Sequence, residues 1–200
     1  TPVALPFPEL ALAHLGDLAG PDALLFAMAS RGTGYARGVE LFVQQRLAGG
    51  LYGQASYAYA RTAHRALDGR WRRGGFDVPH TGTLIAGWVP GPRWELSTRA
   101  SFASGRPFTP MLTEASAAQN RLVLDLGRVN AVRAPAYGRL DVRADRRFVV
   151  RGAATTLFLE VQNVTRRENV FQYVWNPKTR AVQALHQIAF LPVFGLNLQF

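Results

Sequence analysis

The chain contains 200 residues, 48% of them hydrophobic, and its 23 basic and 13 acidic residues give it a formal net charge of +10. It contains no cysteine, which excludes disulfide scaffolds, thiolate zinc sites and cysteine nucleophiles. Only 18% of the residues are charged and the apolar content is high, which excludes an intrinsically disordered chain. No run approaches the ~18 consecutive apolar residues of a membrane-spanning helix, so a helical membrane protein is excluded too.

The basic charge by itself points to a nucleic-acid partner. The arginines are nevertheless spread along the chain, and the dense groups among them are short. Because no recognition motif accompanies them, we expect no nucleic acid among the partners. The chain begins without methionine and without a basic and then apolar leader, as expected of a mature chain or of part of a longer one.

Residues 1–33 show no clear sequence period. Residues 9–20 fit a short amphipathic helix and residues 22–28 fit a strand. We expect the whole segment to be an outer loop or a lead-in to the structured part, which begins at residue 34.

From about residue 38 the dominant period is two, which predicts β-strands. The clearest stretch runs from Arg139 to Val150, where apolar side chains alternate with four charged ones that share a face. The pattern predicts seven strands, over residues 38–47, 51–62, 81–88, 94–102, 139–150, 156–162 and 194–200.

The longest predicted strands run to ten residues or more, and all seven exceed the globular mode of ~5–6; about ten residues suffice for a tilted strand to cross a bilayer. Their connections alternate strictly between short and long. Short periplasmic turns and long extracellular loops alternate in this way in transmembrane β-barrels. The sequence therefore predicts an all-β fold of antiparallel barrel strands. The short connections are at 48–50, 90–92 and 151–153, and the long ones are at 63–78, 106–136 and 165–189.

Aromatic residues collect near the ends of the predicted strands, as expected of the girdles at the two membrane interfaces. The same residues would also suit a soluble core, so they do not decide between the two environments. They are Tyr57, Tyr59, Trp88, Trp94, Phe102 and Phe148.

The long connections carry the candidate ligand contacts. Arginine side chains there suit carboxylate or phosphate groups, and the last long connection contains aromatic residues that predict a hairpin. The candidates are Arg70, Arg72, Arg73, Phe171, Tyr173 and Trp175.

The strongest polar group is the charged row of the 139–150 strand, extended by one carboxylate of the next strand. Opposite charges two residues apart, with partners across strands, are typical of a polar barrel lumen. We favour lumen lining and contact with a plug over direct contact with a substrate. The row consists of Asp141, Arg143, Asp145, Arg147 and Glu160.

No catalytic or metal-binding motif is found. The four histidines, His14, His64, His80 and His186, are far apart and lack the spacing of a metal site. Neither a nucleophile elbow nor a phosphate-binding glycine loop is present. We therefore expect no enzymatic activity, no metal and no cofactor.

Four stretches carry a resemblance to a known family. The terminal LPVFGLNLQF, with apolar Phe194, Leu196, Leu198 and Phe200, resembles the last strand of bacterial outer-membrane barrels. GYARGVEL (34–41), FDVPHTGTLIAGW with SGRPFTP (76–88 and 104–110), and AYGRLDVRADRRF with LFLEVQNVTRRENV (136–170) resemble the distal barrel of TonB-dependent receptors. In order and spacing, the resemblance covers residues 34–200.

The resemblance implies an outer-membrane importer of a scarce solute such as an iron chelate, cobalamin or a glycan. In that family a barrel of about 22 strands encloses an N-terminal plug, and the terminal strand is the signal that the barrel-assembly machinery reads. This chain contains no plug domain and no TonB box, so contact with the TonB complex would require the missing plug. The implied partners are outer-membrane lipid, the assembly machinery and an unknown small ligand.

Two alternatives remain open from the sequence. Seven strands are an odd number, whereas a complete single-chain bacterial barrel has an even number, which favours the C-terminal part of a larger barrel. An eighth strand within residues 1–30 would instead favour a self-contained small barrel with a structural or adhesive role. A soluble β-rich nucleic-acid binder is the third hypothesis.

Overall fold

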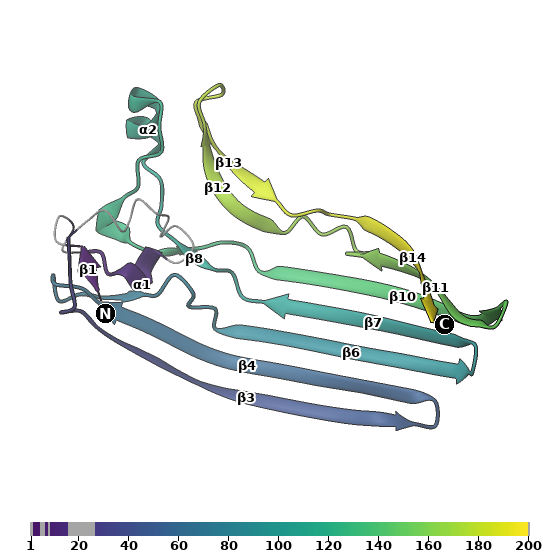
Figure 1. Cartoon of the computed structure of the whole chain (residues 1–200). Helices are drawn as coiled ribbons and strands as arrows, with labels where there is room; N and C mark the ends of the chain where they lie inside the picture. The colour runs from purple at the N-terminus through teal and green to yellow at the C-terminus, as the bar shows by residue number, and fades with distance from the viewer. Residues whose placement is uncertain (1, 5–6, 8, 16–26, 200) are drawn as a thin grey trace.

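The computed structural model describes residues 2–4, 7, 9–15 and 27–199. Its main feature is one antiparallel sheet of seven long strands, which confirms all seven predicted strands (Figure 1). The three-residue β5 (Trp71–Arg73) adds to β4 at the loop end. From edge to edge the strands are β14 (Leu191–Gln199), β11 (Ala153–Gln162), β10 (Tyr137–Val150), β7 (Trp94–Ala103), β6 (His80–Gly91), β4 (Leu51–Arg65) and β3 (Thr33–Ala48).

The three tight turns lie at one end of the sheet and the long connections at the other, as the sequence predicts (Figure 1). Gly49 and Gly50 join β3 to β4 with φ of 60° and 80°, the conformation of a type I′ hairpin turn. Arg151 and Gly152 join β10 to β11 with φ of 50° and 87°. These turns follow the right-handed twist of the strands, so adjacent strands pair along most of their length.

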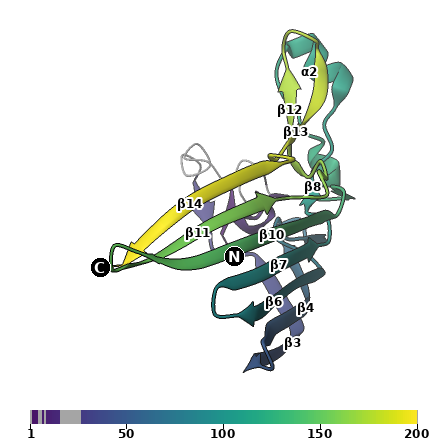
Figure 2. The same cartoon turned by 90° about the vertical axis from the view of Figure 1, so that its right-hand side faces the viewer.

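The long connections contain small elements of their own. The predicted hairpin is present and projects from the loop end of the sheet beside α2 (Figures 1 and 2). The elements are β8 (Pro107–Phe108) paired with β9 (Val132–Arg133), α2 (Thr113–Gln119), the 3₁₀ turn η3 (Leu126–Arg128), and β12 (Val170–Asn176) paired with β13 (Ala181–His186).

The N-terminal segment packs against the loops. Within the helix predicted over 9–20, the described part contains the single turn α1 (Leu12–Leu15); most of the strand predicted over 22–28 lies outside the described residues. β1 (Val3–Ala4) pairs with β2 (Met28–Ala29), and β2 does not join the main sheet. Among the described residues, therefore, no eighth long strand extends the sheet.

Cross-strand register places most of the large apolar side chains on one face, with Phe42, Ile85 and Phe158 on the other. Residues that face each other across strands share a face, and one such row joins Leu51, Trp88, Leu96, Ala144 and Leu159. We call this the apolar face; the opposite side, which carries the charged row of β10, is the polar face. Many side chains of the apolar face are more than one-third exposed, since no other layer of described residues covers them.

Little of the chain is buried. The accessible surface is 12919 Å², whereas a folded monomer of 22.0 kDa exposes about 9,300 Å². Among the described residues, the hydrophobic cluster of buried side chains is small and lies at the loop end; it consists of Val3, Ala11 and Ala66. Among the described residues, no helix has the length and apolarity needed to span a membrane. Stability of this sheet thus depends on whatever covers its faces.

The sheet is open, with β14 at one edge and β3 at the other (Figure 2). Neighbouring strands are antiparallel throughout, so the first and seventh strands run parallel to each other. These two edges cannot close on each other in an antiparallel ladder. Closure of an antiparallel barrel requires an odd number of further strands.

Candidate functional site

The polar face brings the predicted charged row of β10 and β11 together with residues of two further strands, β4 and β7. We call the six residues concerned the polar network: Tyr52, Glu95, Arg143, Asp145, Arg147 and Glu160. They come from β4, β7, β10 and β11, and they face one side because the strand period of two places alternate residues there.

Arg143 is the centre of the network. Its guanidinium donates to both carboxylate oxygens of Asp145, at 2.8 Å from Nε and 2.7 Å from Nη2. Its Nη1 lies 3.5 Å from Glu160 Oε2 on β11. The same guanidinium carbon lies 3.9 Å from the ring centroid of Phe158. Arg143 is therefore fixed by two strands at once.

Arg147 holds the β7 side of the network through an ion pair with Glu95. Glu95 and Asp145 face each other directly across β7 and β10, an arrangement of like charges that is unfavourable alone. Arg147 neutralises one of these carboxylates and Arg143 the other. Asp141, the remaining member of the predicted row, accepts from Arg139 Nε at 2.6 Å and from the Asn163 amide at 2.8 Å.

Two glycines make room for aromatic rings on this face. The Tyr52 ring lies over Gly87, where an added Cβ would come within 2.1 Å of a ring carbon. Phe158 lies over Gly195 in the same way, at 2.4 Å. In both places the ring of one strand occupies the space above the glycine of its neighbour.

The charges on the polar face of β7, β10 and β11 balance. Four carboxylates stand beside four guanidinium groups, and each ion pair remains partly accessible to solvent. Such an array presents fixed, alternating charges to whatever fills the adjacent space, water or protein. The eight residues are Glu95, Asp141, Asp145, Glu160, Arg99, Arg139, Arg143 and Arg147.

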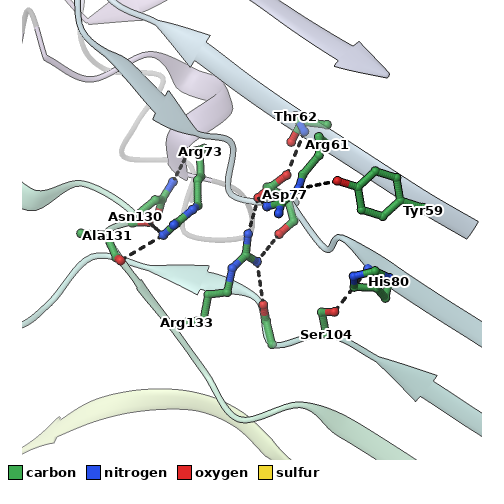
Figure 3. A network of polar contacts seen from close by, with 11 residues as sticks. Tyr59, Arg61, Thr62, Arg73, Asp77, His80, Ser104, Asn130, Ala131 and Arg133 are labelled. Carbon is green, nitrogen blue, oxygen red and sulfur yellow. Dashed lines mark hydrogen bonds and ion pairs between the residues drawn. The ribbon is translucent and has the colours of Figure 1, made fainter. Parts of the chain in front are cut away.

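A second cluster lies at the loop end, around the buried carboxylate of Asp77 (Figure 3). Asp77 is 2% exposed and accepts a hydrogen bond from the Thr62 amide at 2.8 Å. Arg133 pairs with this carboxylate and donates to the carbonyls of Asp77 at 2.6 Å and of Gly105 at 2.9 Å. Asp77 thereby fastens two long connections to the end of β4.

Asn130 continues this cluster toward the N-terminal segment. Its side-chain amide donates to the carbonyls of His14 at 2.8 Å and of Arg73 at 2.9 Å. The backbone amide of Asn130 donates to Thr109 Oγ1 at 3.1 Å. The N-terminal helix and two long connections are thus tied by one residue.

His14 is buried, and its two hydrogen bonds fit the neutral imidazole. Its Nδ1 accepts from the Ala11 amide at 3.1 Å, and its Nε2 lies 3.3 Å from the His64 carbonyl, to which it donates. Burial lowers the pKa of His14 below its ordinary value, because the charged imidazolium loses its hydration. The imidazole therefore acts as a structural hydrogen-bonding group.

The three candidate arginines of the first long connection have different surroundings. Arg72 pairs with Asp68 at 2.5 Å, and this hydrogen bond lowers the pKa of Asp68 below its usual range. Arg73 donates to the carbonyl of Ala131 at 3.0 Å, which joins it to the Asn130 cluster. Arg70 is exposed, and its amide donates to Asp68. Their role in ligand contact stays a prediction.

The aromatic candidates lie on β12, next to the connection between β7 and β10. Tyr173 packs against Phe108 with ring centroids 4.8 Å apart, and Trp175 Nε1 lies 3.5 Å from Asn120 Oδ1. Phe171 and Tyr173 line a cavity of about 150 Å³, large enough for one aromatic ring. The structure thus brings Phe171 and Tyr173 together, but it leaves Arg70, Arg72 and Arg73 outside the cavity lining.

The residues of the predicted assembly signal share the apolar face of β14. Phe194 is 83% exposed, Leu196 57% and Leu198 46%. Their register partners on β11 lie on the same face. Phe200 lies outside the described residues.

No family model matches the chain, and neither a curated protein nor a solved structure is similar to it. Within the described part of the chain, no three histidine, aspartate or glutamate side chains are placed to hold a metal ion. In the polar network, the Tyr52 hydroxyl donates to the Glu95 carboxylate at 2.6 Å. The arrangement is suited to holding structure and presenting charge.

Sequence reasoning missed four residues that organise these two clusters: Tyr52, Glu95, Asp77 and Asn130. Tyr52 and Glu95 stand in strands whose apolar and polar residues alternate. Their position on the polar side of that alternation was the one feature of the sequence that could have identified them. Asp77 stands in the FDVPH stretch that the family resemblance quoted. Nothing in the sequence marks Asn130, whose partners are main-chain atoms far away along the chain.

Proposed function

We propose that this chain is the C-terminal barrel segment of a TonB-dependent outer-membrane transporter that imports a scarce solute. The observation that carries the proposal is the division of the sheet into a charge-free apolar band on one face and an ion-pair array on the other. Four successive cross-strand rows of the apolar face, from Tyr57 to Leu51, contain no charged side chain.

Aromatic residues lie in the end rows of the band and just beyond them. Tyr57, Tyr59 and Phe102 lie toward the loop end, while Trp88 and Trp94 lie toward the tight turns. A membrane interface favours such rings, which combine an apolar body with a polar edge. The strands have 9 to 16 residues, matching or exceeding the ~9–11 that a tilted strand needs to cross the hydrocarbon.

The open edges support membership of a larger barrel. Unpaired backbone groups of β3 and β14 are costly in hydrocarbon, where no water satisfies them. The parallel orientation of the two edges calls for an odd number of added strands, so the seven strands form part of a larger even-numbered barrel. In this proposal the polar network lines the lumen and contacts the plug, and the long connections form the outer loops.

The test uses the absence of native cysteine. Leu84 and Thr83 are neighbours on β6 whose side chains point to opposite faces. The Leu84→Cys and Thr83→Cys variants are each labelled with a nitroxide spin label at the new cysteine and reconstituted into phosphatidylcholine vesicles. We expect lipid-soluble oxygen to relax the label at residue 84, and a water-soluble nickel chelate to relax the label at residue 83. Equal access of the chelate to both positions contradicts the proposal.

Transport itself needs the complete protein. We expect a full-length protein that contains a plug, the preceding barrel strands and this chain to restore energy-dependent uptake in cells that lack it. A charge-reversing Arg143→Glu substitution is expected to disturb the polar network and reduce uptake, whereas Arg93→Gln in the exposed tight turn between β6 and β7 serves as the control. Uptake that persists without the plug argues against the proposed mechanism.

A further inference from the structure

Two arginines face each other directly at the loop end of the apolar face. Arg37 of β3 and Arg61 of β4 are register partners. Along the strands they form the next pair on this face after Val39 and Tyr59. Like charges in this arrangement repel, so the pair is unfavourable unless an anion lies between them. The repulsion marks a position where the molecule gains from a bound negative group.

The nearby carboxylates do not neutralise the pair. Asp77 lies 3.6 Å from Arg61, but it already holds Arg133 and the Thr62 amide. Within the described part of the chain, Arg37 lies within ion-pair distance of no carboxylate, and Glu40 of the same strand points to the polar face. At least one positive charge is therefore left uncompensated.

Tyrosine rings hold the two guanidinium groups at the surface. Arg37 lies over the Tyr35 ring at 5.2 Å, and Arg61 lies over the Tyr59 ring at 5.9 Å. Arg61 Nε also donates to the Tyr59 hydroxyl at 3.3 Å. Stacking on Tyr35 leaves the guanidinium edge of Arg37 available for paired hydrogen bonds with phosphate oxygens, while Arg61 keeps its contacts with Tyr59 and Asp77.

Apolar residues begin immediately below this pair. Val39 and Leu41 follow on β3, 63% and 62% exposed, with Tyr57 beside Leu41 on β4. A ligand that matches both parts must combine a phosphate with long hydrocarbon chains. A free phosphate ion uses only the arginines, and a nucleic acid has no long hydrocarbon chain to lie along the apolar band.

We propose that Arg37 and Arg61 bind the phosphate of a membrane lipid whose acyl chains lie along Val39 and Leu41. The proposal rests on the membrane placement of the apolar face given above. It adds a lipid-selective site at the rim near the loops, where the phosphate compensates the paired arginines. The bound lipid thereby fixes the height of the sheet in the bilayer.

The experiment measures binding of a phosphatidic acid with a fluorescent acyl chain to the full chain in neutral detergent, with the matching diacylglycerol as the phosphate-free probe. We expect the wild-type chain to bind phosphatidic acid at least about tenfold more tightly than diacylglycerol. Arg37→Gln is expected to remove most of that preference and Arg37→Lys part of it. Arg121→Gln is expected to leave it unchanged.

Arg37 is the position to change because Arg61 also reaches Asp77. Circular dichroism of each variant establishes that the sheet is present, and Arg37→Lys supplies a charged variant if the neutral one fails to fold. Equal binding by wild type and Arg37→Gln overturns the proposal. Full competition by millimolar inorganic phosphate also overturns it, since the site would then recognise a free anion.

The lipid proposal and the membrane placement fail in different ways. Flotation of the chain with phosphatidylcholine vesicles tests the placement without relying on phosphate selectivity. A chain that floats but binds both lipids equally contradicts only the arginine site. A chain that does not float contradicts the proposed function as well.

Discussion

The hydroxyl of Tyr52 donates a hydrogen bond to Glu95 at 2.6 Å across the strand that separates them. Tyr52 lies on β4 and Glu95 on β7, with β6 between. The contact is possible because the intervening residue is Gly87, whose missing side chain leaves space for the ring. A glycine in the middle of a long strand, normally unfavourable, is here required by the polar face.

Gly87→Ala is expected to destabilise the sheet by about 1–3 kcal/mol, since the added Cβ overlaps the Tyr52 ring and displaces its hydroxyl from Glu95. The matched control is Gly82→Ala on the same strand, where the nearest atom lies 3.6 Å from the added Cβ. Urea unfolding of both variants in vesicles, followed by tryptophan fluorescence, gives the comparison. A smaller loss for Gly87→Ala than for Gly82→Ala contradicts the assigned role of the glycine.

The sequence predicted the strands and their connections because period two and turn residues are local signals. The row from Asp141 to Arg147 was predicted to share a face, and its register agrees. The partners of that row were not predictable, since the pairing of Arg147 with Glu95 depends on which strands are neighbours and in what register. Asn130, which bonds to main-chain carbonyls of two distant segments, was inaccessible to pattern reasoning for the same reason.

Asp77→Asn is expected to release the long connections from the end of β4. The substitution leaves Arg133 and Arg61 without their buried counter-charge, and breaking such a pair costs about 3–5 kcal/mol. Hydrogen exchange is expected to accelerate at the Thr62 and Asn130 amides while the tight-turn end of the sheet is unaffected. Asp125→Asn is the control, because its side chain is not deeply buried and an amide oxygen can still accept from Gly127. Uniform acceleration over the whole sheet argues that Asp77 has a global role instead.

Acidification is expected to loosen the N-terminal segment. The folded pKa of His14 is lowered, so above pH ~6.5 both folded and unfolded states are neutral and the full stability is present. As the pH falls below that value, the unfolded state takes up a proton first and stability is lost. Protonated Nδ1 also can no longer accept from the Ala11 amide.

The measurement is hydrogen exchange at residues 11–14 between pH 7.5 and 5, corrected for intrinsic exchange rates. His14→Asn keeps an acceptor for the Ala11 amide but does not titrate, so its protection is expected to be independent of pH. His64, Asp68 and Arg72, which face position 14, are present in both proteins. A pH dependence that survives in His14→Asn assigns the effect to another group.

Phe194 provides a test of the predicted assembly signal that is separate from folding stability. The side chain is 83% exposed, so Phe194→Gln removes almost no packing within the chain. In the proposed membrane setting it removes an apolar group from the lipid-facing side of the last strand, and the outer-membrane yield of the complete protein is expected to fall several-fold. Asn197→Gln, on the polar face of the same strand, is expected to leave the yield unchanged. Equal yields for the two variants contradict both the assembly signal and the lipid exposure of this face, whereas a loss confined to Phe194→Gln supports them.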